Sequence, residues 1–171
     1  MRKPRFLFAA GIFAIVFPFF VNRRMRVFRK TVIHAKPEEI FPFLNDLRNW
    51  PLWTEWSRRD EMRASYNGPP AGVGATQQWE TEKMNGILKI THSTPDARIA
   101  YTLDMAGEKY HFDGVIALDA AGPLTTVTWT CKWDTGENPY ARYPGLLIKR
   151  CIRCDFAAGL ANLKSLIEGT R

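Results

Sequence analysis

Apolar and polar positions follow three different patterns along this chain. Residues 6–21 form an apolar run without a charged side chain. Between residues 75 and 133, short segments alternate apolar and polar side chains with a period of two, which indicates β-strands with one covered face. From about residue 146 to 168, apolar residues recur at steps of three or four, which predicts one long amphipathic helix. We therefore expect an apolar N-terminal segment followed by a single α+β domain.

Turn-forming residues separate the strand-like segments. Residues 67–74 (NGPPAGVG) are rich in Gly and Pro and predict a loop. This loop is not a phosphate-binding one, because no Lys-Ser/Thr pair follows it and no βαβ unit surrounds it. The regular spacing predicts an antiparallel meander. The expected strands are residues 27–34, 75–82, 86–93, 98–105, 110–119 and 125–133.

A short helical region is expected between the first two strands. Pro37, Glu38 and Glu39 suit the first turn of a helix, where the acidic side chains face the positive end of its dipole. Pro42 should keep this helix short or distorted. Three tryptophans then recur at every third residue, which predicts a helical turn with the indoles along one side, namely Trp50, Trp53 and Trp56.

The charge distribution argues against a nucleic-acid-binding protein. The chain has 171 residues and a formal net charge of +7, with 24 basic and 17 acidic residues. Eight of the basic residues and none of the acidic ones lie in residues 1–30. Residues 31–171 therefore hold 16 basic and 17 acidic side chains, a net charge of −1. A folded domain that binds DNA or RNA should carry a basic face of its own.

The apolar run predicts a membrane anchor. Residues 6–21 would span roughly 24 Å as a helix, and flanking arginines can extend it toward the hydrocarbon thickness of about 30 Å. A cleaved signal peptide and an interfacial helix fit less well, because no small-x-small cleavage site follows and no polar face exists. We expect a single-pass protein of the cell membrane, with residues 1–26 as anchor, residues 27–171 as domain, and the lipid bilayer as a partner of residues 6–21.

The side of the membrane on which the domain lies depends on the basic residues that flank the anchor. Five basic residues follow the anchor and three precede it, so the positive-inside rule places the domain in the cytoplasm. An anchor that is oriented by its basic first residues would instead send the domain outside.

Cysteine and histidine content points to neither a disulfide framework nor a metal site. The chain has three cysteines, an odd number. Cys151 and Cys154 form a Cys-x-x-Cys pair, but they fall in the predicted helix without the further ligands that zinc needs. We expect no metal and no cofactor.

Four ordered segments carry a resemblance to a known family. They are "VIHAKPEEIFPFLNDLRNWPLWTEW" (32–56), "GPPAGVGATQQWE" (68–80), "TTVTWT" (125–130) and "DFAAGLANLKSLIE" (155–168). Together they resemble the START-like (SRPBCC) superfamily, specifically its bacterial polyketide cyclase/dehydrase group. The resemblance implies a helix-grip fold, in which an antiparallel sheet wraps around a long C-terminal helix over a deep cavity. It also implies an apolar ligand such as a lipid, quinone, hormone or polyketide, while some relatives catalyse cyclisation or dehydration.

Candidate cavity residues are the inward-facing apolar side chains of the alternating strands and of the long helix, although the same side chains would fill a solid core equally well. The expected function is binding of a hydrophobic small molecule, and the alternative is a polyketide cyclase or dehydratase that uses an acid–base pair. In the preferred alternation His92 shares a face with Leu88 and Ile90 and points inward, while His111 and Asp113 share the face opposite Phe112 and point to solvent. A third interpretation has the Trp50/Trp53/Trp56 side dock a partner. The expected ligand-binding residues are Trp79, Ile90, Tyr101, Leu103, Phe112, Trp129, Trp133, Phe156, Leu160 and Leu163, and the catalytic candidates are His92 and Tyr101.

Overall fold

The computed structural model describes residues 16–59, 62–82, 84–107 and 109–169 of the chain. A short helical segment, residues 16–20, precedes the domain. The strands are β1 (Arg24–Ile33), β2 (Arg63–Asn67), β3 (Thr76–Glu80), β4 (Asn85–Thr94), β5 (Arg98–Met105), β6 (Tyr110–Ala121) and β7 (Leu124–Asp134). The helices are α2 (Pro37–Asn45), η1 (Leu47–Leu52), α3 (Trp56–Arg59), η2 (Pro139–Ala141) and α4 (Arg142–Glu168), where η marks a 3-10 helix.

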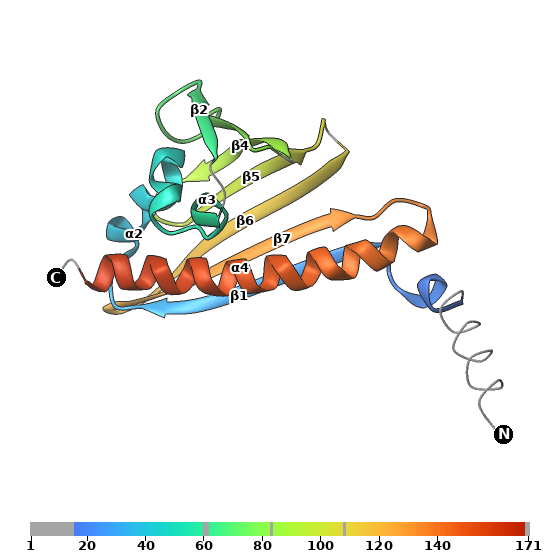
Figure 1. Ribbon diagram of the computed structural model, residues 1–171. Helices are drawn as coiled ribbons and strands as arrows, with labels where there is room; N and C mark the ends of the chain where they lie inside the picture. Colours follow the sequence, from blue (N-terminus) through green and yellow to red (C-terminus); the bar gives the residue numbers. More distant parts are fainter. Residues whose placement is uncertain (1–15, 60–61, 83, 108, 170–171) are drawn as a thin grey trace.

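All seven strands form one antiparallel sheet. Their order is β1-β7-β6-β5-β4-β3-β2, so the meander runs from β2 to β7 and β1 closes the far edge beside β7. Figure 1 shows α4 along β1 and β7 on one face, while the remaining strands fan away from it. We call the face that α4 covers the inner face. This arrangement confirms the expected helix-grip α+β domain.

The predicted membrane span lies mostly outside the described residues. No helix within the ranges that the structure describes is both long enough and apolar enough to cross a membrane. β1 begins at Arg24, three residues before the expected start of the domain. The strand therefore follows the apolar segment after only two residues, Asn22 and Arg23.

Strand β2 was missed by the sequence reasoning. Its five side chains are all exposed, and it lies at the edge of the sheet, where it pairs only with β3. Apolar and polar residues alternate in a strand only where one of its faces is buried. This edge strand has no buried face, so its sequence carries no period-two pattern.

The tryptophan-rich region packs inward. Trp50 and Trp53 are fully buried, and their indole N–H groups donate to the carbonyl oxygens of Leu44 (2.9 Å) and Phe43 (3.1 Å). The interpretation that these indoles form a docking face for a partner is therefore wrong. Trp50 lies in the 3-10 helix η1 and Trp53 caps its C-terminal end, whereas Trp56 begins the separate helix α3.

Candidate functional site

The C-terminal half of α4 covers an interior that aromatic rings fill. Trp129 of β7 lies at its centre and stacks on Phe156 with ring centroids 3.8 Å apart. Three further indoles pack edgewise or tilted against Trp129, at centroid distances between 5.1 and 6.1 Å. They are Trp50, Trp53 and Trp56. We call this region the filled half.

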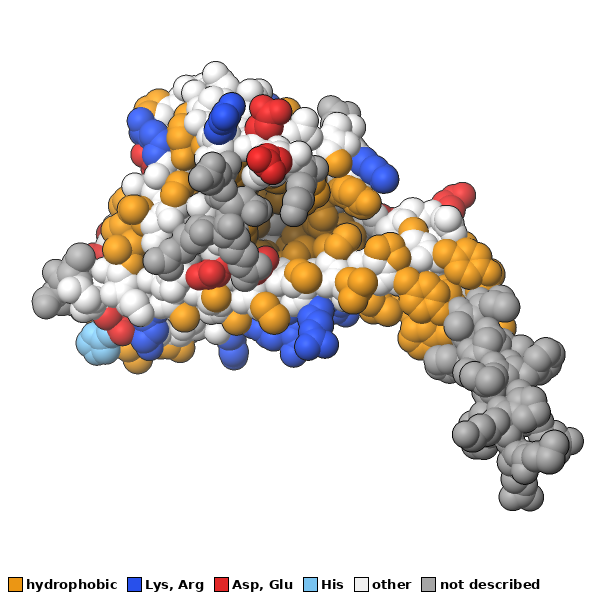
Figure 2. Space-filling view, viewed as in Figure 1, with side chains coloured by type: hydrophobic (Ala, Val, Ile, Leu, Met, Phe, Trp, Pro, Cys, Tyr) orange, Lys and Arg blue, Asp and Glu red, His pale blue; other side chains and the backbone are white. Residues whose placement is uncertain are grey.

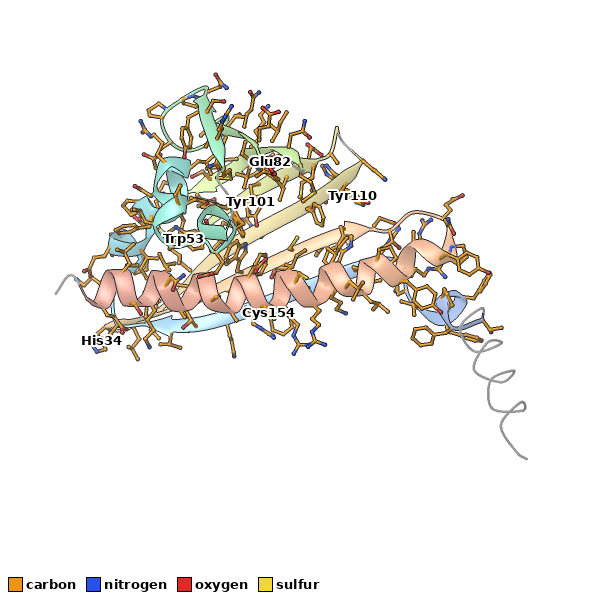
Figure 3. The ribbon with its side chains drawn as sticks, in the orientation of Figure 1. His34, Trp53, Glu82, Tyr101, Tyr110 and Cys154 are labelled. Atoms are coloured by element: carbon orange, nitrogen blue, oxygen red, sulfur yellow. The ribbon has the colours of Figure 1, made fainter. Side chains whose placement is uncertain are left out.

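Tyr101 of β5 links the sheet to the aromatic rings of the filled half. Its ring lies directly over Gly114 of β6, where an added Cβ would come within 2.0 Å of the ring. Its hydroxyl oxygen accepts a 2.8 Å hydrogen bond from Trp129 Nε1. Burial raises the pKa of Tyr101 well above its ordinary value of 10.0, so the hydroxyl stays protonated at neutral pH. Figure 3 shows Tyr101 and Trp53 on separate elements that converge above α4.

The N-terminal half of α4 leaves a groove against the sheet. Between Gly145 and Phe156 every residue of this helix keeps some exposed surface, whereas four residues after Phe156 are buried. Figure 2 shows hydrophobic side chains at the bottom of a hollow above α4, between α3 and strands β4 to β6. The residues that register and burial place around it are Leu103, Met105, Phe112, Trp133, Ile148 and Ile152. We call this set the groove.

The groove combines a buried floor with half-exposed walls. Phe112 pairs with Leu103 across β5 and β6, and its ring lies 5.7 Å from that of Trp133. Phe112 and Trp133 are 5% and 7% exposed, while Leu103, Ile148 and Ile152 are only partly buried. Packed cores bury such side chains, so this apolar surface lacks a cover among the described residues.

Nine of the ten predicted ligand-binding residues divide between these two regions. Leu103, Phe112 and Trp133 belong to the groove, whereas Trp79, with its ring over Gly86 of β4, lines a separate open depression across β2 to β4. The other six are buried in the filled half or the adjoining core, where they contact one another and the indoles. They are Ile90, Tyr101, Trp129, Phe156, Leu160 and Leu163. The expectation of a deep cavity between the sheet and the C-terminal helix is therefore wrong for the C-terminal half of α4, where aromatic rings fill that space.

His92 does not share the inner face with Tyr101, which corrects the expected acid–base arrangement. A β-bulge in β4 interrupts the register between Ile90 and His92. The extra residue shifts the alternation by one position, because two residues then oppose one on the partner strand. Ile90 remains buried, His92 is exposed, and Ser93 turns inward to donate a 2.7 Å hydrogen bond to Asn45. His92 and Tyr101 thus lie on opposite faces of the sheet and cannot act on one bound molecule.

His111 lies on the outer face between two carboxylates, as expected for a solvated position. Its Nδ1 is 2.5 Å from Asp104 and its Nε2 is 3.5 Å from Asp113. The hydrogen bond to Asp104 raises the pKa of His111 above its ordinary value of 6.5. The cluster is separated from the groove by the sheet itself.

Two open depressions lie away from the groove. One of about 630 Å³ crosses strands β2 to β4 between Arg63 and Asp104, and its lining mixes polar side chains with Trp79 and Ile87. The other, about 390 Å³, lies beside His34 and Lys164 at the far end of α4. Neither lies between α4 and the inner face.

The cysteines offer no built metal site. Cys151 and Cys154 are both exposed on α4, whereas Cys131 is buried in β7. Burial raises the pKa of Cys131 to about 12, so its thiol stays protonated and weakly reactive. Within the described ranges, no group of three or more His, Cys, Asp or Glu side chains could hold a metal ion.

The family model described as "Polyketide cyclase / dehydrase and lipid transport" matches residues 24–168. No curated protein matches the chain. Among solved structures, protein MLL2253 from Mesorhizobium loti aligns with a TM-score of 0.65 and 13% identity, over 86% of this chain and 99% of its own. Protein CV1439 from Chromobacterium violaceum aligns with a TM-score of 0.58 and 17% identity, over 85% and 97%.

DynU16, a putative protein in the dynemicin biosynthetic locus, aligns with a TM-score of 0.58 and 13% identity over 88% of this chain. The chain spans only 49% of the length of DynU16. At these identities the three structures share the fold with this chain, and ligands or reactions do not follow from the fold.

Proposed function

We propose that this chain, which belongs to the polyketide cyclase / dehydrase and lipid transport family, is a membrane-tethered protein that binds a hydrophobic small molecule in the groove. The ligand would be lipid-like, quinone-like or polyketide-like. The observation that carries the proposal is the contrast along α4, where a filled half adjoins an apolar groove whose walls are half exposed. Concave apolar surfaces of this kind are how proteins hold small molecules.

The residues before β1 support a position of the groove close to the bilayer. Phe17 and Phe19 lie 6.2 and 6.3 Å from the rings of Tyr143 and Tyr140, at the start of α4 and in η2. Arg142 donates a hydrogen bond to the carbonyl oxygen of Pro18. The end of the apolar N-terminal segment is thus held against the beginning of α4, which is also the open half.

The same end of the molecule exposes large apolar side chains. Figure 2 shows them as a cluster beside the start of the grey N-terminal trace. Aromatic and leucine side chains that stay exposed next to a predicted span are typical of the membrane interface. The exposed members are Phe19, Phe20, Tyr140, Tyr143 and Leu147, with Leu147 68% and Phe20 83% exposed.

Basic side chains extend this surface along the outer face of β1. Arg24, Arg26 and Lys30 alternate with buried residues and are exposed. Figure 2 shows Lys and Arg side chains gathered below α4, on the side where β1 lies in Figure 1. Each such charge near anionic headgroups contributes about 1 kcal/mol of attraction. A tethered groove at this surface could exchange its ligand directly with the bilayer. The cytoplasmic side of the membrane remains the expected location of the domain.

The proposal is tested by narrowing the groove in the full chain. Leu103→Trp and Ile152→Trp place an additional ring in the groove, and Val115→Trp places the same ring on the outer face of β6. We expect a defined hydrophobic compound in organic extracts of the purified wild type and of Val115→Trp, and its loss from the two groove variants. Lipids bound around the apolar segment should be the same in the wild type and the three variants, so they do not affect the comparison of extracts. Identical extracts from all four folded proteins would contradict the proposal.

A further inference from the structure

One buried indole in the groove has an unused hydrogen-bond donor. Trp133 of β7 is 7% exposed, and its Nε1 atom has no hydrogen-bond partner among the residues that the structure describes. Buried N–H groups are nearly always paired, because losing water without gaining a partner is costly. A donor left in this state inside an apolar surface points to an acceptor supplied from outside the chain.

The other three fully buried indoles all donate hydrogen bonds to acceptors within the chain. Trp50 and Trp53 donate to backbone carbonyl oxygens, and Trp129 donates to the hydroxyl oxygen of Tyr101. All three belong to the filled half. The unpaired donor is thus confined to the half of the inner face that the protein leaves uncovered.

The neighbours of Trp133 restrict the chemistry of the missing acceptor. The register places Met25 of β1 beside it, Phe112 of β6 packs against its ring, and Cys131 is the next inward residue of β7. None of these side chains is charged, and the thiol of Cys131 stays protonated. A carboxylate or phosphate placed here would lose its hydration without a counter-charge from these strand neighbours, which makes an ionised acceptor unfavourable.

We propose that the indole N–H of Trp133 donates a hydrogen bond to the carbonyl oxygen of an uncharged, otherwise apolar ligand in the groove, such as a ketone, an ester or a quinone. The inference rests on the proposed function and adds the polar feature by which the groove selects its ligand. A single donor at the buried floor also fixes where in the groove the carbonyl group of an elongated ligand lies.

A pair of matched probes tests this inference separately from binding itself. The full chain, labelled with ¹⁵N-tryptophan and held in nanodiscs of saturated diether phosphatidylcholine, which has no ester carbonyl, is titrated with 8-pentadecanone and with pentadecane. Trp133→Phe assigns the indole resonance, and replacement of Trp133 by benzothienylalanine removes the N–H group while keeping the shape of the ring. We expect both probes to perturb the groove, and only the ketone to move the Trp133 Nε1 proton downfield.

The affinity ratio supplies the second measurement. In the wild type the ketone should bind about tenfold more tightly, relative to the alkane, than in either variant that lacks the N–H group. Equal ratios in all proteins, with both probes bound, would overturn the hydrogen bond and leave the apolar groove intact. Failure of both probes to bind would overturn the proposed function as well.

Discussion

The phenyl ring of Phe156 lies on the indole of Trp129, with centroids 3.8 Å apart and ring planes 8° from parallel. This stack joins α4 to the middle of the sheet at one point along the helix. On its C-terminal side α4 buries its apolar residues against rings and the sheet, and on its N-terminal side Ile152 and Ile148 remain half exposed. The stack therefore marks the boundary between the filled half and the groove.

This boundary predicts that shortening two side chains on the same face of α4 lowers the free energy of unfolding by different amounts. Phe156→Ala should lower the free energy of unfolding by about 3–5 kcal/mol, because it opens a cavity among closely packed rings. Ile152→Ala, one helical turn earlier, should cost only about 1–2 kcal/mol, because that side chain is half exposed. Urea unfolding of the full chain in one detergent, followed by tryptophan fluorescence, measures both changes. Equal costs would show that the helix is packed uniformly.

The hydrogen bond between Trp129 and Tyr101 predicts a second destabilisation. Tyr101→Phe removes the acceptor and leaves a buried indole N–H unpaired, which should cost about 1–3 kcal/mol. Tyr110→Phe is the matched control, because Tyr110 is 38% exposed and its hydroxyl is accessible to water in both the folded and the unfolded state. The same unfolding measurement should find the control within about 0.5 kcal/mol of the wild type. An unchanged free energy of unfolding in Tyr101→Phe would contradict a stabilising hydrogen bond between Trp129 and Tyr101.

The outer-face cluster predicts a pH dependence. The hydrogen bond to Asp104 raises the pKa of His111 above 6.5 in the folded state. The charged pair therefore stabilises the fold below pH 6.5, and this contribution is lost as the pH rises through the higher folded pKa. Imidazole resonances in a pH titration should show a lower pKa of His111 in Asp104→Asn and an unchanged one in Asp119→Asn, which is an exposed control on β6, the strand of His111. An unchanged midpoint in Asp104→Asn would exclude the pairing.

Much of this architecture could be predicted from periodicity alone. The alternation of residues 98–105 gave the bounds of β5 without error, and the three-four spacing located α4 except for its first turn. These signals are strong because each element buries one face against the other. The sequence pattern missed the first turn of α4 because that turn contacts Phe17 and Pro18 and has few buried apolar positions to mark it.

The site was harder to predict, and the reasons are local. One inserted residue in β4 reverses the faces of His92 and Ser93, and no feature of the sequence marks that bulge. The division of α4 depends on how rings from η1 reach Trp129 across the fold, which is a matter of tertiary packing. Alternation placed Leu103, Phe112 and Trp133 on the covered face, yet it carries no information on whether α4 fills the space above them.

The proposed membrane position predicts a depth gradient along α4. Leu147 is 68% exposed near the residues that hold the N-terminal segment, while Ala161 is exposed toward the other end of the helix. A fluorescent label at Leu147→Cys should be quenched strongly by brominated lipids, and the same label at Ala161→Cys should be quenched little. Both labels are placed in a background with Cys151→Ser and Cys154→Ser, because those two thiols are exposed and would react.

Buried Cys131 can remain in that background, because its high pKa keeps the thiolate concentration low during labelling. The gradient follows from geometry, since α4 has 27 residues and rises about 1.5 Å per residue, so fourteen positions separate the labels by roughly 21 Å. Equal quenching of the two labels would mean that α4 lies flat on the bilayer, and quenching of neither would mean that the groove is held away from it. Either result would remove the argument that the ligand enters from the membrane.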